Sequence, residues 1–232
     1  MPLFTLTFFA VGGIIAALST LGGWKIYGFI DTIRKYRQTT MAAYVVCSPT
    51  WLQFASKAAI QRPLKFFRIN DEVMGGKSQS DIAFNSPAFL APNGLRFSGV
   101  INTNGGGFCS CRTLGDEEPL GLTSNSTLLV DATGDGQRHK VTLMTADSWE
   151  MSVPTWAHDF VATKDRATYR LRLSDFVASK QGRMAKGTKL DAEKVTGIGF
   201  SLSLYAMDGE KNDKFGAGPF LLEVHGVREV AE

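Results

Sequence analysis

The fold of this chain is decided by two glycine-rich stretches, NDEVMGGKSQS at residues 70–80 and NGGGFCSCR at residues 104–112. Between them, Leu95 to Ile101 alternates apolar and polar side chains, which predicts a half-buried strand. Glycine clusters beside a strand usually provide positive φ angles or let another backbone approach closely. The sequence therefore predicts two glycine-rich turns held on a β framework.

Short alternating segments continue downstream, separated by turn residues such as Gly134-Asp135-Gly136. They cover residues 128–130, 141–143, 169–173, 198–204 and 220–224. Many short alternating strands with few helical stretches are typical of an antiparallel β-sandwich or jelly roll. The stretch 180–189 is rich in Gly, Lys and Ser and is expected to be a loop.

Composition is ordinary for a folded protein, with 44% hydrophobic and 20% charged residues in a chain of 232. The net charge of +3 is unevenly distributed. Of 25 Lys and Arg and 22 Asp and Glu, residues 24–68 hold eight and one, which leaves 17 and 21 for residues 69–232. A nucleic-acid-binding domain would carry the basic excess itself, so no nucleic-acid partner is expected. The basic segment fits anionic lipid or an acidic partner.

The N-terminal region predicts a membrane anchor. Leu3 to Leu21 is apolar, uncharged and nineteen residues long, about enough to cross a bilayer. A cleaved signal peptide is the rival reading, but no basic residue precedes the run and no small-x-small site closes it. The basic residues that follow place the rest of the chain on the inner face. We therefore expect an anchor over residues 1–30, a basic amphipathic linker or helix over 31–62, and a β domain over 63–232.

The three cysteines are too few for a disulfide framework. Cys109 and Cys111 are two residues apart, so on a strand they point to the same face, where a bridge would be strained. We expect Cys47, Cys109 and Cys111 to be reduced and packed in or against the core, which weakly favours a reducing compartment.

Catalytic patterns are missing from the sequence. The histidines His139, His158 and His225 lie far apart, and none has a metal-ligand neighbour at close spacing. No Gly-x-Ser-x-Gly elbow occurs, and the 104–107 glycines lack the following Lys-Ser/Thr of a phosphate-binding loop. Asp135 is expected to close an Asx turn. We predict no catalytic residue, no metal and no cofactor, and therefore a protein that is not an enzyme.

The 70–80 stretch resembles the Asn-Asp-x-Val-Met-Gly-Gly-x-Ser-x-Ser signature of the complex I intermediate-associated protein family. Later blocks of the family match in order over residues 63–229, namely FSG at 97–99, NGGGF to Arg112 at 104–112, GDGQRHK at 134–140, LSDF at 173–176, GIGF at 197–200 and GPFLLEV at 218–224. The resemblance implies a galactose-binding-like jelly-roll β-sandwich and a role in assembling mitochondrial respiratory complex I. Chloroplast relatives imply photosynthetic assembly as an alternative.

The signature also supplies the candidate site residues, as family positions or partner contacts. These are Asn70, Asp71, Val73, Met74, Gly75, Gly76, Ser78, Ser80, Gly106, Gly107, Phe108 and Arg112. Val73 and Met74 are candidates for a contact loop, while Asn70, Asp71 and Arg112 are expected to form a buried polar network that pins the two glycine turns. Phe108, Trp149 and Trp156 are further contact candidates.

Together these features predict a non-enzymatic assembly factor or accessory subunit of complex I. It would be anchored in the inner mitochondrial membrane through Leu3 to Leu21, face the matrix, and bind membrane-arm subunits through its β-sandwich. Two alternatives stay open. One is a plastid photosystem assembly factor on the stromal side of the thylakoid membrane. The other is a carbohydrate-binding module with Trp149 and Trp156 as stacking platforms.

Overall fold

The computed structural model describes residues 52–54, 66–84, 94–113, 118–149, 153–180 and 183–231. All belong to one compact unit, Tyr44–Glu232. The expected Leu3–Leu21 span, Cys47 and most of the 31–62 linker lie outside these residues. Within the described ranges, no helix is both long and apolar enough to cross a membrane.

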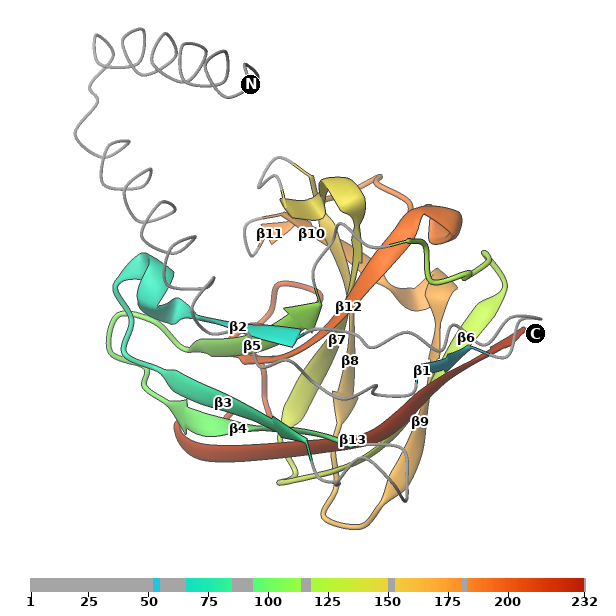
Figure 1. The fold of residues 1–232 in the computed structure, drawn as a ribbon. Coiled ribbons are helices and arrows are strands. Elements are labelled where there is room, and N and C mark those ends of the chain that lie inside the picture. The colour runs from blue at the N-terminus through green and yellow to red at the C-terminus, as the bar shows by residue number, and fades with distance from the viewer. Residues whose placement is uncertain are drawn as a thin grey trace, which may run out of the picture. The chain divides into compact units, whose positions relative to one another are not determined.

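Two facing sheets make up the domain (Figure 1). The first has the order β3-β4-β13-β6-β9, with β1 parallel to β13 and all other pairs antiparallel. Its strands are β1 (Leu52–Phe54), β3 (Gln79–Phe84), β4 (Leu95–Ile101), β6 (Ser126–Gly134), β9 (Ala167–Arg172) and β13 (Gly218–Ala231).

The second sheet has the order β11-β10-β8-β7-β12-β5-β2. Its strands are β2 (Phe66–Asn70), β5 (Phe108–Thr113), β7 (Arg138–Thr145), β8 (Thr155–Val161), β10 (Val177–Lys180), β11 (Arg183–Met184) and β12 (Val195–Ser203). In the described parts of the chain, four single-turn 3-10 helices connect the strands: η1 (Asp71–Met74), η2 (Ala146–Trp149), η3 (Leu173–Asp175) and η4 (Ala192–Lys194).

The predicted antiparallel β-sandwich is confirmed, and β4 covers the predicted strand Leu95–Ile101. The prediction of a loop over residues 180–189 is partly wrong, because Arg183–Met184 pairs with the end of β10 and forms a short hairpin at the edge of the sheet. A short hairpin at the edge of a sheet buries little apolar surface. Its strands therefore need no alternation of apolar and polar residues, and the sequence gives no sign of them.

The core fills the space between the sheets. Phe97 of β4 and Phe220 of β13 meet edge to face with ring centroids 4.9 Å apart. Gly99 lets β3 approach β4 closely, because an added Cβ at this position would lie 2.1 Å from the carbonyl oxygen of Gln79. The FSG block therefore holds β3, and the loop before it, against the rest of the sandwich.

Candidate functional site

Asp71 is the centre of a buried polar network at the start of η1. Its side chain is inaccessible to solvent. One carboxyl oxygen accepts the backbone N–H of Ser78 at 2.9 Å. The other accepts the Ser78 hydroxyl at 2.6 Å and the backbone N–H groups of Gly107 at 2.7 Å and Phe108 at 3.3 Å. We call Asp71, Ser78, Gly107 and Phe108 the Asp71 network, and it joins the two glycine-rich stretches.

Glycines form the walls around the Asp71 carboxyl. A Cβ added at Gly76 or Gly106 would lie 2.2 Å from the nearest atom of that carboxyl group. Gly75 ends η1 in the left-handed region, with φ of 87°, and its N–H donates to the Glu72 carbonyl at 3.1 Å. The glycines of the signature therefore serve close approach and positive φ, as the sequence indicates.

A second buried contact lies beside the first. The Ser80 hydroxyl donates to the Asn70 side-chain oxygen at 2.6 Å. Cys109 and Cys111 are free and fully buried on β5. Burial raises the pKa of each thiol to about 12, so both stay protonated and are poor nucleophiles. The expectation that these two cysteines pack in the core is confirmed.

The structure thus brings together Asn70, Asp71, Ser78, Ser80 and the glycines of both stretches. Arg112 lies elsewhere on β5. Its register partners are Phe67 and Gly199, three residues or about 10 Å along the strand from Cys109 at the Asn70 end. The donors that hold Asp71 are Ser78, Gly107 and Phe108, so the loops are pinned without the predicted Arg112 contact. The Val73 side chain lies outside the described part of the chain.

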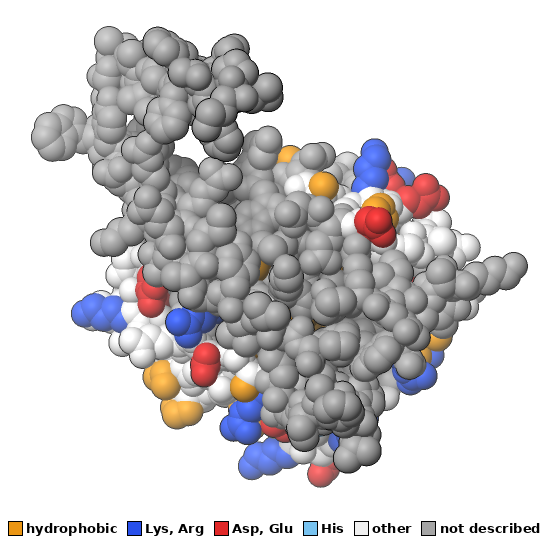
Figure 2. All heavy atoms as spheres, viewed as in Figure 1, with side chains coloured by type: hydrophobic (Ala, Val, Ile, Leu, Met, Phe, Trp, Pro, Cys, Tyr) orange, Lys and Arg blue, Asp and Glu red, His pale blue; other side chains and the backbone are white. Residues whose placement is uncertain are grey.

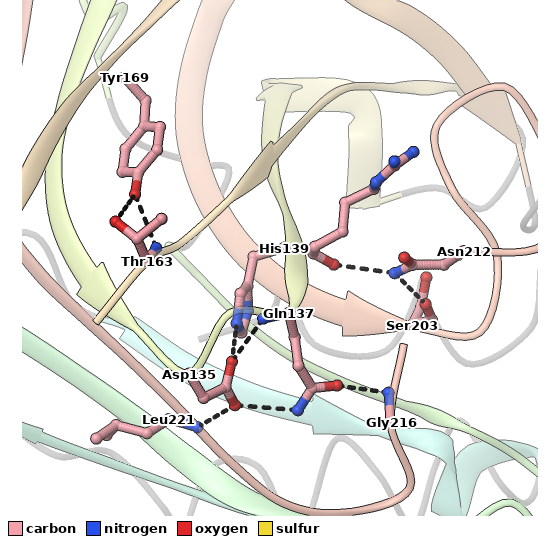
Figure 3. A network of polar contacts seen from close by, with 10 residues as sticks. Asp135, Gln137, His139, Thr163, Tyr169, Ser203, Asn212, Gly216 and Leu221 are labelled. Carbon is pink, nitrogen blue, oxygen red and sulfur yellow. Dashed lines mark hydrogen bonds and ion pairs between the residues drawn. The ribbon is translucent and has the colours of Figure 1, made fainter. Parts of the chain in front are cut away.

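Asp135 forms a second network in the β6–β7 turn (Figure 3). It accepts the backbone N–H of Gln137 at 3.0 Å, which is the expected Asx turn, and the Gln137 side-chain amide at 3.0 Å. It also accepts the N–H of Leu221 in β13 at 3.0 Å and contacts Nε2 of the buried His139 at 3.4 Å. We call Asp135, Gln137, His139 and Leu221 the Asp135 network.

The contacts in this network set the charge of Asp135. Burial alone would raise the pKa of its carboxyl, but the hydrogen bonds from His139, Leu221 and Gln137 outweigh burial and hold that pKa well below its usual range. The sequence analysis missed the tie to Leu221. The sequence shows only that GDGQRHK and GPFLLEV are both blocks of the family. Their separation along the chain does not predict that Asp135 contacts Leu221.

The β12–β13 loop links the two networks. The N–H of Leu204 donates to the Gly107 carbonyl at 3.0 Å, and the N–H of Gly216 donates to the Gln137 side chain at 2.7 Å. Residues 71–78, 102–107, 135–137 and 204–217 therefore lie at one end of the sandwich, which we call the loop end. Figure 1 shows η1 there beside the β4–β5 turn.

Exposed apolar side chains gather at the loop end. Met74 of η1 is 67% exposed, and Tyr205 and Val100 are each half exposed close to the same loops. Among the described residues only one other large apolar side chain is comparably exposed, Met184 on β11. Charged side chains of both signs are mixed over the face seen in Figure 2. The loop end thus presents exposed apolar side chains on loops that the two networks hold in place.

The remaining candidates are placed as follows. Trp156 is a core residue, 5% exposed, so its ring face is unavailable to a sugar or a partner, and that expectation was wrong. The Trp149 side chain lies outside the described part of the chain, and Phe108 is half-buried. His158 is half-buried and packs on Phe176. Over the described ranges, no group of three or more His, Cys, Asp or Glu could hold a metal ion.

Comparison with known proteins places the chain in a family. No curated protein matches the sequence. Among solved structures, the chain is similar to a family 11 carbohydrate-binding module from Clostridium thermocellum in complex with a β-1,3-1,4-mixed-linked tetrasaccharide, at 15% identity and a TM-score of 0.43, covering 69% of this chain and 88% of that one. It is also similar to a family 30 carbohydrate-binding module, at 14% identity and a TM-score of 0.46, covering 68% of this chain and 80% of that one.

The sequence model of one protein family matches residues 52–224, which is most of the chain and includes both networks. The chain belongs to the complex I intermediate-associated protein 30 family.

Proposed function

We propose that this protein is a non-enzymatic assembly factor or accessory subunit of mitochondrial respiratory complex I. Its N-terminal segment, Leu3 to Leu21, anchors it in the inner membrane with the β domain in the matrix. The domain binds membrane-arm subunits of the complex through the loop end. Family membership supports the link to complex I, and the apolar N-terminal run supports the anchor.

The observation that carries the proposed contact is the contrast between Asp71 and Met74. Asp71 is fully buried and holds η1 in place through two hydrogen bonds from Ser78 and one each from Gly107 and Phe108, while Met74, three residues later, is 67% exposed. A rigid backbone that presents an apolar side chain loses little conformational entropy on binding, which favours affinity. Methionine also adapts its shape to an apolar partner.

Charge substitution at Met74 tests this function. Tagged full-length Met74→Glu is expected to copurify at least tenfold less complex I membrane-arm subunit from mitochondria than the native chain, with an unchanged melting temperature. Met184→Glu is the matched control, because Met184 is also an exposed methionine but lies on β11. Equal recovery with Met74→Glu would overturn the proposed contact.

Purification of the same tagged chain from a membrane extract that contains both mitochondria and plastids separates the alternatives. Recovery of photosystem subunits in place of complex I would establish the plastid role. Presence in assembly intermediates but not in the active complex would identify a transient factor, whereas presence in both would identify an accessory subunit.

A further inference from the structure

A positively charged stretch lies at one edge of the seven-stranded sheet, where β10 pairs with β11 (Figure 1). Residues 180–190 contain four basic residues and no acidic one. Residues 69–232 hold 17 Lys and Arg and 21 Asp and Glu, so without this stretch the numbers would be 13 and 21. The stretch therefore concentrates positive charge on an otherwise acidic domain. We call Lys180, Met184, Lys186 and Lys189 the basic hairpin.

The three lysines of the basic hairpin are exposed and have no partner within the part of the chain that the structure describes. No ion pair and no side-chain hydrogen bond involves them there. The acidic residue that follows the stretch, Asp191, pairs with Lys194 at 2.9 Å. Residues 180–194 still contain five basic residues against two acidic ones. The lysine charges are therefore available to an anionic partner.

Ala185 and Leu190 hold the basic hairpin on the sandwich. The N–H of Ala185 donates to the Ala178 carbonyl at 2.8 Å, and both Ala185 and Leu190 pack against the core. Because side chains alternate along a strand, Met184 points away from the core, and it is 40% exposed. A backbone fixed on the core thus presents an apolar side chain among ammonium groups.

An anionic phospholipid surface is the partner that fits this combination. Lysine ammonium groups are point charges without the fork of arginine, so they suit a surface of phosphate groups that imposes no fixed geometry. Met184 would meet apolar surface at the boundary between headgroups and acyl chains, while the lysine stems extend to the headgroups. A nucleic-acid backbone offers phosphate groups but no such apolar boundary.

The basic hairpin lies apart from the loop end. β10 pairs with the start of β8, where Ser179 lies opposite Thr155, whereas the end of β8 pairs with Arg138 beside the Asp135 network. β11 is also at the opposite edge of the sheet from β2, which leads into η1 and Met74. A membrane bound at the basic hairpin therefore leaves Met74 available to a protein partner.

We propose that the basic hairpin binds anionic phospholipid headgroups and forms a membrane contact of its own, separate from the N-terminal segment. This contact goes beyond the proposed function and does not depend on the anchor. Each lysine near an anionic surface contributes about fivefold to the affinity, and salt screens this attraction because the charges are exposed.

Oxidation of methionines in the full-length chain tests the proposal. Met184 and Met74 are both exposed, and hydrogen peroxide converts accessible methionines to the sulfoxide. The chain is placed in nanodiscs of phosphatidylcholine, or of phosphatidylcholine with phosphatidylglycerol. The anionic discs are expected to slow oxidation of Met184 at least threefold and to leave that of Met74 unchanged. High salt should remove the difference.

Two triple variants with the same change in net charge provide the controls. K180E/K186E/K189E should show equal oxidation of Met184 in both discs. K77E/K211E/K214E reverses three exposed lysines around the loop end and should keep the native difference. Equal oxidation of Met184 in both discs for the native chain would overturn the proposal, as would loss of the difference in the loop-end variant.

The anchor and the basic hairpin can fail separately. If the chain stays out of phosphatidylcholine discs, the anchor of the proposed function fails. Either kind of disc is then added to the free chain, and oxidation of Met184 is compared in the same way. Protection of Met184 by polyglutamate but not by anionic discs would overturn the lipid contact and assign the basic hairpin to an acidic protein.

Discussion

The Asp71 and Asp135 networks use the same chemistry in different surroundings. Each carboxyl group accepts backbone N–H groups from two segments that are far apart in sequence. Asp71 is sealed between Gly76 and Gly106, with no space for a Cβ on either side. Asp135 is 23% exposed and is wrapped by the side chains of Gln137 and His139.

The difference shows where the fold depends on a single geometry. Water can reach Asp135 and replace a lost partner, whereas the donors around Asp71 are buried and have no substitute. Asp71 therefore determines the position of the loop that carries Met74. Asp135 orients the Gln137 side chain, which in turn binds Gly216 of the β12–β13 loop. The predictions below test this contrast.

Asp71→Ala should have the largest effect. It leaves buried backbone donors of Gly107 and Ser78 without an acceptor, so we expect a loss of about 3–5 kcal/mol in the free energy of unfolding. Asp135→Ala should cost about 1–2 kcal/mol because water takes over part of its role. Urea denaturation measures both, and equal losses would show that burial does not distinguish the networks.

Glycine substitutions come next. Gly106→Ala places a Cβ 2.2 Å from the Asp71 carboxyl, so we expect a loss of roughly 2–3 kcal/mol through forced displacement of that group. Gly136→Ala meets open space, and its φ of 89° alone should cost about 1 kcal/mol. Thermal unfolding of the two variants separates overpacking from backbone strain. A larger loss at Gly136 would contradict the packing argument.

The sequence predicted the elements better than the connections between them. Strands such as Leu95–Ile101 are visible because their side chains alternate, and the glycine pairs are visible because few other residues adopt their geometry. The sequence indicates that Asp71 contacts the other glycine turn, but not which groups of that turn it binds. The N–H groups that reach its carboxyl depend on how β2, β3 and β5 pack. The predicted contact of Arg112 with Asp71 is not needed, because an aspartate enclosed by backbone N–H groups is stabilised without a cation. Val100 alternates with the core residues Phe97 and Ile101, so its exposure follows from the strand pattern, whereas the exposure of Tyr205 has no signal in sequence.

Acid should weaken the Asp135 network selectively. Its native pKa is lower than the unfolded value of about 4, so the carboxylate contributes stability above about pH 4 and loses it as the pH falls toward the native pKa. At pH 7, Asp135→Asn should be less stable than the native chain by roughly 1 kcal/mol, and this gap should narrow at pH 3. Urea midpoints at the two pH values measure the gap, with Asp165→Asn as a control on the neighbouring β8–β9 turn. A gap that stays constant would mean that the carboxylate charge is not what holds the turn.

The smallest effect concerns coupling between the networks. Among the described residues, the β12–β13 loop joins them through the Leu204 N–H on Gly107 and the Gly216 N–H on Gln137. Ser78→Ala and Gln137→Ala have no shared partner, so a double-mutant cycle should give a coupling energy below about 0.5 kcal/mol. A coupling energy of about 1 kcal/mol or more would show that the loop end responds as one unit. A partner bound at Met74 would then also change the stability of the Asp135 turn, whereas weak coupling confines the effect of binding to the Asp71 loops.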